Sequence, residues 1–400
     1  MKQSLALPLA VLALLAPAAS QAMKIPIPVE GATLNLSFQL QTQFQMQENG
    51  APNGNGNSYD IFIRRSRVLI NGDIGPNFTY LIQFDNPNYG KKGNFQARAY
   101  MQDAWVGWAP TGLTGPNVFF IDAGLLLLPI SHNLLSSTTN YVTADNHSDA
   151  FRGLNGGALP GFRSTGVQVR GWAFNKKVGF RGGVYEGLRP AGTTPANAAI
   201  APNANPQIAG FVNFDLIGSE EGGWLYGAYK WGKDPILSVG ASGLYQSKVL
   251  VNAATSSLSD QQLISVDSYL NLPMTEAAEL VAEVNLYFNR NGSNSASTGL
   301  GGSADLGYRF GAIAPYVGYD FFSADACDSG LTAKQCAPVT GTTGDARNFK
   351  LGVNYFFNKN LNHLNVEFGI NHGQSKDAAS NTTLTAAATK SFLMHWNTVF

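Results

Sequence analysis

Three arginines, Arg64, Arg65 and Arg67, form the densest group of cationic side chains in the sequence. Arg65 and Arg67 are two positions apart, so in a strand they point to the same side. A row of guanidinium groups on a channel wall lowers the barrier to anions. Acidic side chains at the same height on neighbouring strands would turn the same row into an ion-pair network. Both roles are compatible with the sequence, and Asp85 and Asp103 are the acids expected to pair with Arg65 and Arg67.

The other charged residues that we expect on the inner faces of the strands include both acids and bases. Arg64 falls on the opposite side of its strand from Arg65, so we expect it at the lipid headgroups or at a subunit contact. The remaining pore-lining candidates are Asp85, Arg170, Arg181, Glu279, Glu283, Arg309 and Asp320. Along all the inner faces we infer, acids are at least as numerous as bases. If these faces line a channel, this balance of charges favours weak charge selectivity over a cationic anion channel.

Residues 127–162 break the alternating pattern and contain many turn formers. A structureless segment of this length is uncommon in a compact fold and usually has a function. We expect a long loop that folds inward and narrows the pore, with these candidate residues at the constriction: His132, Asp145, His147, Asp149 and Arg152. Acids flank His147, but spacing within a loop is weak evidence for a metal, so no metal or cofactor is expected. No histidine lies in a G-x-S-x-G context, and the chain is not expected to be an enzyme.

The elements that position these residues show a period of two. In residues 33–46 (TLNLSFQLQTQFQM) apolar side chains alternate with Asn, Ser and Gln, and residues 389–400 continue the same pattern. Alternation of this kind gives a strand one apolar face and one polar face. The polar face carries neutral amides where a soluble sheet usually carries charges, which suits a lumen. First and last strands of one type can pair and leave no open edge.

The composition also favours a barrel in a membrane. Charged residues make up 13% of the chain, well below the roughly 25% of soluble domains. Lys and Arg together number 26, as do Asp and Glu, and this neutral balance does not suggest nucleic-acid binding. Low charge, many glycines and aromatic residues, and no long apolar helix after the N-terminus are typical of a transmembrane β-barrel.

About sixteen strands fit the alternation, and their connections are alternately short and long. Short periplasmic turns and long outer loops are typical of outer-membrane barrels, so both termini are expected in the periplasm. Residues 224–233 are ambiguous and fit either a strand end or a structured turn. Sixteen strands leave room for a water-filled channel. Tryptophans near strand ends, among them Trp105, Trp172 and Trp231, are expected in interfacial girdles.

The N-terminal residues 1–22 combine Lys2, an apolar run and small residues in the order of a secretory signal peptide. Residues 23–400 would then form a single all-β antiparallel barrel in the outer membrane of a Gram-negative-type bacterium. Cys327 and Cys336 lie in a polar segment, and export to an oxidising compartment predicts a disulfide between them.

The stretch YDIFIRRSRVLINGDIGPNFTYLIQFD, residues 59–85, resembles the opening hairpin of the phosphate-selective porin O/P family. The residues that match its pattern are Phe62, Arg64, Arg65, Arg67, Gly72, Tyr80 and Asp85. The segments GVQVRG (166–171) and ILSVG (236–240), and the terminal Phe400, are similar to porins of that superfamily. The resemblance implies a sixteen-stranded homotrimer, surrounded by outer-membrane lipid, with a long third loop in its lumen. It implies passive diffusion of small hydrophilic solutes, or alternatively anion or phosphate selectivity through lumen arginines.

Overall fold

The computed structural model describes the chain over most of its length. The described residues are 23–51, 56–151, 162–188, 205–220, 224–232, 234–251, 258–291, 298–324, 345–376, 383–385 and 388–400. Within them one short 3-10 turn, η1 (Lys91–Gly93), interrupts an otherwise all-β chain, and no helix is long and apolar enough to cross a bilayer.

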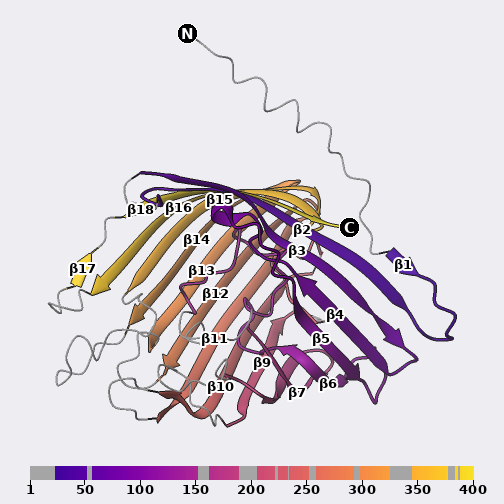
Figure 1. Ribbon diagram of the computed structural model, residues 1–400. Helices are drawn as coiled ribbons and strands as arrows, with labels where there is room; N and C mark the ends of the chain where they lie inside the picture. Colours follow the sequence, from indigo (N-terminus) through magenta and orange to yellow (C-terminus); the bar gives the residue numbers. More distant parts are fainter. Residues whose placement is uncertain are drawn as a thin grey trace.

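The strands run antiparallel to their neighbours in a single sheet (Figure 1). Sixteen of them are long, and β1 and β17 are additions of three residues each. Their bounds are β1 (Met23–Ile25), β2 (Leu34–Gln47), β3 (Ser58–Ile74), β4 (Phe78–Asp85), β5 (Tyr100–Trp108), β6 (Val118–Leu127), β7 (Arg163–Ala173), β8 (Val178–Tyr185), β9 (Gln207–Ile217), β10 (Ile236–Val251), β11 (Leu258–Thr275), β12 (Ala278–Arg290), β13 (Gly299–Phe310), β14 (Ile313–Ala324), β15 (Ala346–Asn358), β16 (Asn362–Lys376), β17 (Thr383–Thr385) and β18 (Thr389–Val399).

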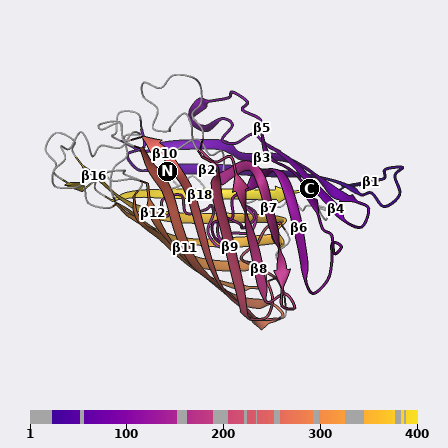
Figure 2. The same ribbon diagram turned by 90° about the horizontal axis from the view of Figure 1, so that it is seen from below.

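The sheet closes where the last long strand meets the first. β18 pairs with β16 on one side and with β2 on the other, and Figure 2 shows the yellow β18 beside the indigo β2. Phe400 extends this seam: its amide donates to the carbonyl of Phe38 at 2.8 Å and its carbonyl accepts from the Phe38 amide at 3.1 Å. Closure pairs the backbone groups of both edges, which a strand in hydrocarbon requires. The sixteen-stranded antiparallel barrel predicted from the sequence is confirmed.

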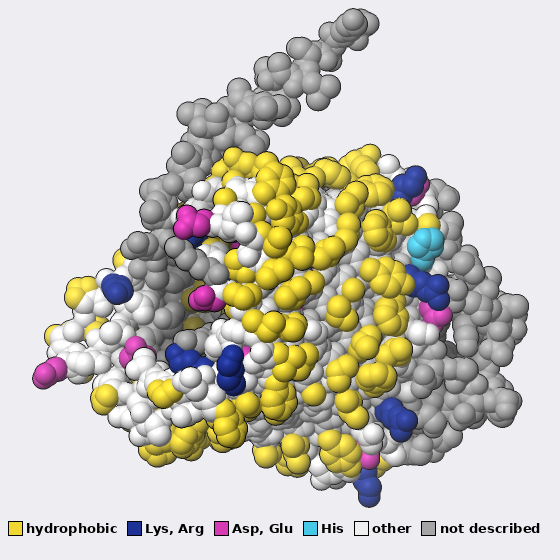
Figure 3. Space-filling view, turned by 180° about the vertical axis from the view of Figure 1, so that it is seen from behind, with side chains coloured by type: hydrophobic (Ala, Val, Ile, Leu, Met, Phe, Trp, Pro, Cys, Tyr) yellow, Lys and Arg dark blue, Asp and Glu magenta, His cyan; other side chains and the backbone are white. Residues whose placement is uncertain are grey.

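The alternation of each strand separates an outer apolar surface from an inner polar one. In β2 the amides of Gln39, Gln41 and Gln43 are buried inside, while Phe38 and Leu40 are 43% and 36% exposed outside. Figure 3 shows hydrophobic side chains covering much of the outer wall, with charged side chains gathered towards its margins. This surface matches the hydrocarbon of a bilayer, and the polar faces are kept for the lumen.

The two ends of the barrel differ in their connections. At one end, which we call the turn end, the strands are joined by short turns such as residues 75–77 and 311–312. At the other, the loop end, connections include residues 128–162 and 325–345. Residues 218–235, between β9 and β10, are the longest connection at the turn end and depart most from this rule.

Candidate functional site: a lumen filled by two inward segments

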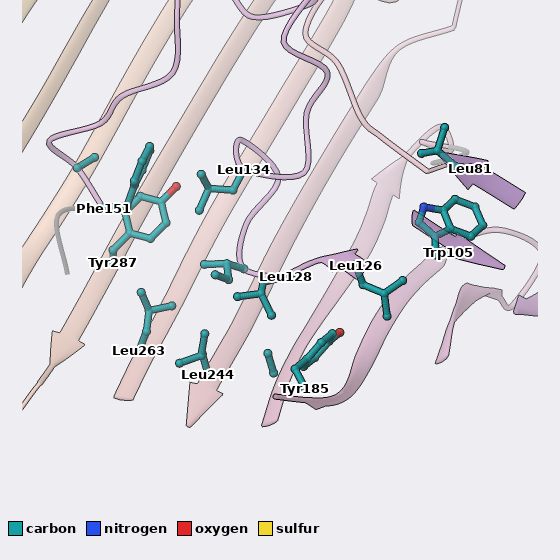
Figure 4. Packing of buried hydrophobic residues seen from close by; sticks show 13 residues of the cluster. Leu81, Trp105, Leu126, Leu128, Leu134, Phe151, Tyr185, Leu244, Leu263 and Tyr287 are labelled. Atoms are coloured by element: carbon teal, nitrogen blue, oxygen red, sulfur yellow. The ribbon is translucent and has the colours of Figure 1, made fainter. Parts of the chain in front are cut away.

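Residues 128–151 enter the barrel from the loop end and lie against its inner wall (Figure 1). One side of this inner loop is apolar, and it meets an apolar patch on the inner face of β8 to β12. Leu128, Ile130 and Leu134 pack there with Leu244 and Leu263, which are 3% and 2% exposed (Figure 4). Leucines facing inward would be poorly placed in an open aqueous pore, so the packing holds the inner loop as a built-in part of the lumen.

A buried histidine fastens the first part of the inner loop to the wall. His132 Nε2 lies 2.9 Å from a carboxylate oxygen of Glu220, and His132 Nδ1 lies 3.2 Å from one of Glu283. Burial alone would lower the pKa of His132, but Glu220 and Glu283 outweigh it and raise the pKa to about 10. The imidazolium and Lys230, 2.6 Å from Glu220, hold the pKa of Glu220 below its ordinary value despite its burial. His132 is therefore a cation at neutral pH.

A second histidine repeats this arrangement on the next strands of the wall, where Asp305 is the direct cross-strand partner of Glu283. His147 Nε2 lies 2.7 Å from Asp305 of β13, and its Nδ1 lies 2.9 Å from Asp320 of β14. Lys350 also contacts Asp320, at 3.1 Å. Burial lowers the pKa of His147 and Asp305 raises it, with a net rise to about 9. Nearby, the amide of Asn348 donates to Asp149 at 2.7 Å. Both histidines thus act as buried cations between two carboxylates.

The arginine cluster of β3 makes its contacts with the inner loop. Arg64 Nε and Arg65 Nη2 donate to the two carboxylate oxygens of Asp145, at 2.8 and 2.7 Å. Burial would raise the pKa of Asp145, and the two arginines outweigh it and hold it well below its usual range. The expectation that Arg64 lies on the opposite side of the strand is wrong. The register between β2 and β3 shifts here: Gln41 pairs with Arg65 and Thr42 with Ile63, so Arg64 is the extra residue of a β-bulge.

The third arginine is neutralised by its own neighbour on the wall. Arg67 Nε donates to Asp85 of β4 at 2.9 Å, as the ion-pair interpretation predicted. Its Nη1 also donates to Thr138 of the inner loop at 2.8 Å. Asp103, the other expected partner, is paired with Arg163 at 3.1 Å instead.

A second segment, residues 224–232, enters from the turn end. Its tyrosines and tryptophans pack on the inner wall, where Tyr229 lies against Phe356 with ring centroids 5.3 Å apart. Glu279 accepts from Arg309 at 2.5 Å, and the guanidinium of Arg309 lies 4.0 Å from the centroid of Trp231. Trp231 is therefore inside the barrel, and its expected place in an interfacial girdle is wrong.

Two arginines of β7 and β8 lie against aromatic rings of this turn-end segment and of β5 and β6. Arg170 pairs with Asp122 at 2.6 Å and lies over Phe120 at 4.0 Å. Arg181 lies over Trp224 at 5.2 Å and donates to the carbonyl of Trp224. Trp224 packs on Trp105 with ring centroids 4.4 Å apart. Trp105 is 7% exposed and also lies inside, against expectation; ring faces stabilise the guanidinium groups where water is excluded.

The structure brings the sequence-predicted residues together, but it covers them. Arg65, Arg67, Asp85, Arg170, Arg181, Glu279, Glu283, Arg309 and Asp320 are all buried, none more than 7% exposed. In this structure they hold the inward segments rather than facing open water. Arg152, Cys327 and Cys336 lie outside the described residues.

Sequence reasoning missed the partners that come from the turn end, notably Glu220, Trp224 and Lys230. Its only signal there was the failure of residues 224–233 to alternate. It also missed the role of Asp122, because the sequence around a single acidic residue in a strand does not indicate which residue it pairs with.

One strip of the inner loop remains half-exposed. Residues 137–141 are partly accessible, whereas residues 128–136 and 142–144 are buried. This strip lies opposite β2 and β3, where Thr138 accepts from Gln39 at 3.1 Å and its carbonyl accepts from Gln41 at 3.0 Å. Arg64 and Asp145, 24% and 21% exposed in their side chains, continue it towards the loop end. The accessible polar surface of the lumen is therefore off-centre, beside the amide-rich wall.

Comparison with known proteins shows which solved structures share this architecture. Neither a family model nor a curated protein sequence matches the chain. Solved structures do match it. The outer-membrane channel DcaP of Acinetobacter baumannii aligns with a TM-score of 0.56 and 12% identity, over 92% of this chain and 98% of that one. The Salmonella typhi OmpF structure in complex with daunomycin aligns at 0.55 and 11%, over 94% and 100%.

The chain has the porin fold. A third structure, outer-membrane expressed OmpT of Vibrio cholerae, agrees, with a TM-score of 0.54 and 12% identity over 95% of this chain and 100% of that one. At these identities the likeness concerns the fold alone. The resemblance to the phosphate-selective porin O/P family stays a prediction from the hairpin motif.

Proposed function

We propose that the protein is an outer-membrane porin through which small hydrophilic solutes and ions diffuse passively. The observation that carries the proposal is the half-exposed polar strip, residues 137–141, which Gln39 and Gln41 of β2 hold by hydrogen bonds to Thr138 within a closed barrel. Amides and hydroxyls exchange hydrogen bonds with passing water at little cost, so a path lined by them suits neutral solutes and ions of either sign.

Charge balance favours weak selectivity over an anion or phosphate channel. Arg65, Arg67, Arg170 and Arg309 each contact a carboxylate within 3 Å. A guanidinium paired in this way presents little net potential to a permeating anion. A phosphate-selective path would need these arginines to exchange their carboxylates for the anion, which their burial opposes.

The surroundings of the barrel follow from the same proposal. We propose outer-membrane lipid around the apolar wall, a homotrimer, a signal peptide at residues 1–22, and a Cys327–Cys336 disulfide. A trimer form of OmpT of Vibrio cholerae has the same fold, with a TM-score of 0.50 and 12% identity, which supports a trimer here.

The test is conductance of the purified protein in planar bilayers under a KCl gradient. We expect channels with ohmic currents and a small reversal potential. Changing Arg65 and Arg67 together to Ala should alter the conductance modestly. A large anion-selective reversal potential with block by submillimolar phosphate, both lost in the double variant, would favour the phosphate channel. A folded barrel without any conductance contradicts the proposal altogether.

A further inference from the structure

The two inward segments enter from opposite ends of the barrel and meet in its interior. The amide of Tyr226 donates to the carbonyl of Leu135 at 2.9 Å, and the amide of Ser137 donates to the carbonyl of Tyr226 at 2.9 Å. Ser136 and Tyr226 thereby form a parallel β-bridge. A third bond runs from the Ala228 amide to the carbonyl of Asn140, at 2.9 Å. Backbone pairing of this kind fixes both the distance and the register of two chains.

Asn140 completes this junction with its side chain. Its Nδ2 donates to the carbonyl of Tyr229 at 3.1 Å, and its Oδ1 accepts from the amide of Tyr229 at 2.8 Å. Opposite it, Gly227 leaves no room for a side chain, because a Cβ there would lie 2.2 Å from the Asn140 amide nitrogen. The pair is therefore matched in shape as well as in hydrogen bonding.

Each segment is also seated on the wall by itself. The inner loop packs on Leu244 and Leu263, and Tyr229 of the turn-end segment packs on Tyr269 and Phe356. Gly307 of β13 leaves space for the Tyr229 hydroxyl, 2.5 Å from where a Cβ would lie. Two segments that are fastened separately and joined in the middle behave as one rigid body.

We propose that residues 224–232 are a second constriction element, docked permanently on the inner loop, and that the Asn140–Tyr229 junction sets the size limit of the pore. The junction belongs to the same strip, residues 137–141, that lines the accessible path. Thr138 fastens that strip to β2 and β3, and the turn-end segment holds it from the other side, so the bulk of this segment determines how much of the lumen the two elements fill together. This inference rests on the proposed function as a diffusion channel.

The first experiment removes the support. Residues 224–231 are replaced by a Gly/Ser stretch of equal length, and single-channel conductance and sugar uptake by liposomes are measured. We expect a larger conductance and entry of sugars that the unchanged protein excludes. Trp108→Ala, which removes an aromatic ring 43% exposed on the outer wall, is the control and should change neither. An unchanged size limit in a conducting, folded replacement variant overturns the inference and leaves the diffusion channel standing.

The second experiment fixes the junction and does not rely on the replacement variant folding. A Cβ at Gly227 would lie 3.1 Å from the Asn140 Cβ, and a disulfide needs about 3.5–4.5 Å, so after a shift of a few tenths of an ångström N140C/G227C should cross-link on oxidation. The variant is made with Cys327→Ser and Cys336→Ser. Because the docked state is the conducting one, oxidised and reduced channels should conduct equally. Loss of current on oxidation, restored by reduction, would show that the segments must part and would overturn permanent docking. If the folded variant carries no current in either redox state, and the unchanged protein carries none as well, the proposed function itself is rejected.

Discussion

Arg65 of the barrel wall and Asp145 of the inner loop are joined by an ion pair of 2.7 Å whose arginine is almost fully buried. The contact ties the most cationic stretch of the sequence to the segment that narrows the lumen. The ion pair uses the charge of Arg65 to position the inner loop. Asp145 remains partly exposed on the side of the half-exposed strip. Under the proposed function, selectivity and loop position therefore depend on the same pair.

Changing Asp145 to Asn should move the channel towards anions. The amide keeps an oxygen acceptor in nearly the same shape, but it leaves the charges of Arg64 and Arg65 uncompensated. The reversal potential under a KCl gradient should shift in the direction of greater chloride permeability. Glu276→Gln, the same loss of charge in an exposed turn, should leave the potential unchanged. A shift of equal size in both variants would assign the effect to overall charge rather than to the lumen.

The anchoring of the inner loop should weaken at alkaline pH. The pKa values of His132 and His147 are raised from about 6.5 to about 10 and about 9. A group whose pKa is higher in the folded state stabilises it fully below its unfolded pKa, and this contribution is lost as the pH rises through the folded value. Backbone hydrogen exchange of residues 128–151, corrected for its intrinsic pH dependence, should therefore be slowest below about pH 6.5 and become progressively faster up to about pH 10.

A separate change is expected in acid. The pKa values of Asp145 and Glu220 are lowered, so their contribution is present above the ordinary carboxyl pKa and is lost as the pH falls below it. If the hydrogen exchange of residues 128–151 changes only between pH 5 and 7, where a free imidazole titrates, the assignment of both histidines as buried cations is contradicted.

An arginine on the outer wall should destabilise the barrel according to its depth. Val284, in the middle of β12 and 45% exposed, faces hydrocarbon, and Val284→Arg should cost about 2–4 kcal/mol of unfolding free energy. Met274→Arg, near the end of β11, should cost about 0–1 kcal/mol. Denaturant titration of the protein refolded into lipid vesicles measures both. Equal costs would mean that the bilayer does not lie where the apolar surface indicates.

A side chain at Gly301 should displace the end of the inner loop. A Cβ there would lie only 1.7 Å from the carbonyl oxygen of Ala150, and backbone cannot yield as the tip of a flexible side chain can. Gly301→Val should leave the barrel folded, as judged by heat-modifiable migration, while protease cuts near residue 150 become faster. Gly373→Ala, where a Cβ meets nothing within 4 Å, is the control. Unchanged protection in Gly301→Val would show that β13 does not seat the inner loop.

Much of the architecture was determined by the sequence itself. The period of two in residues 33–46 and the short and long connections gave sixteen strands and a closed seam, because strand faces depend on local alternation alone. The pairing of Arg67 with Asp85 was also within reach, since both lie on one hairpin. The inward path of residues 128–151 agrees with the expectation drawn from the length and irregularity of residues 127–162.

The contacts of the charged residues depend on the tertiary fold. A single bulge turned Arg64 inwards, and no alternation pattern reveals a one-residue register shift. Glu220 reaches His132 across 88 positions of sequence, and Asn140 reaches Tyr229 across 89. Such contacts depend on how two irregular segments fold inside a closed wall, where burial forces each charge to find a partner from a distant strand or loop.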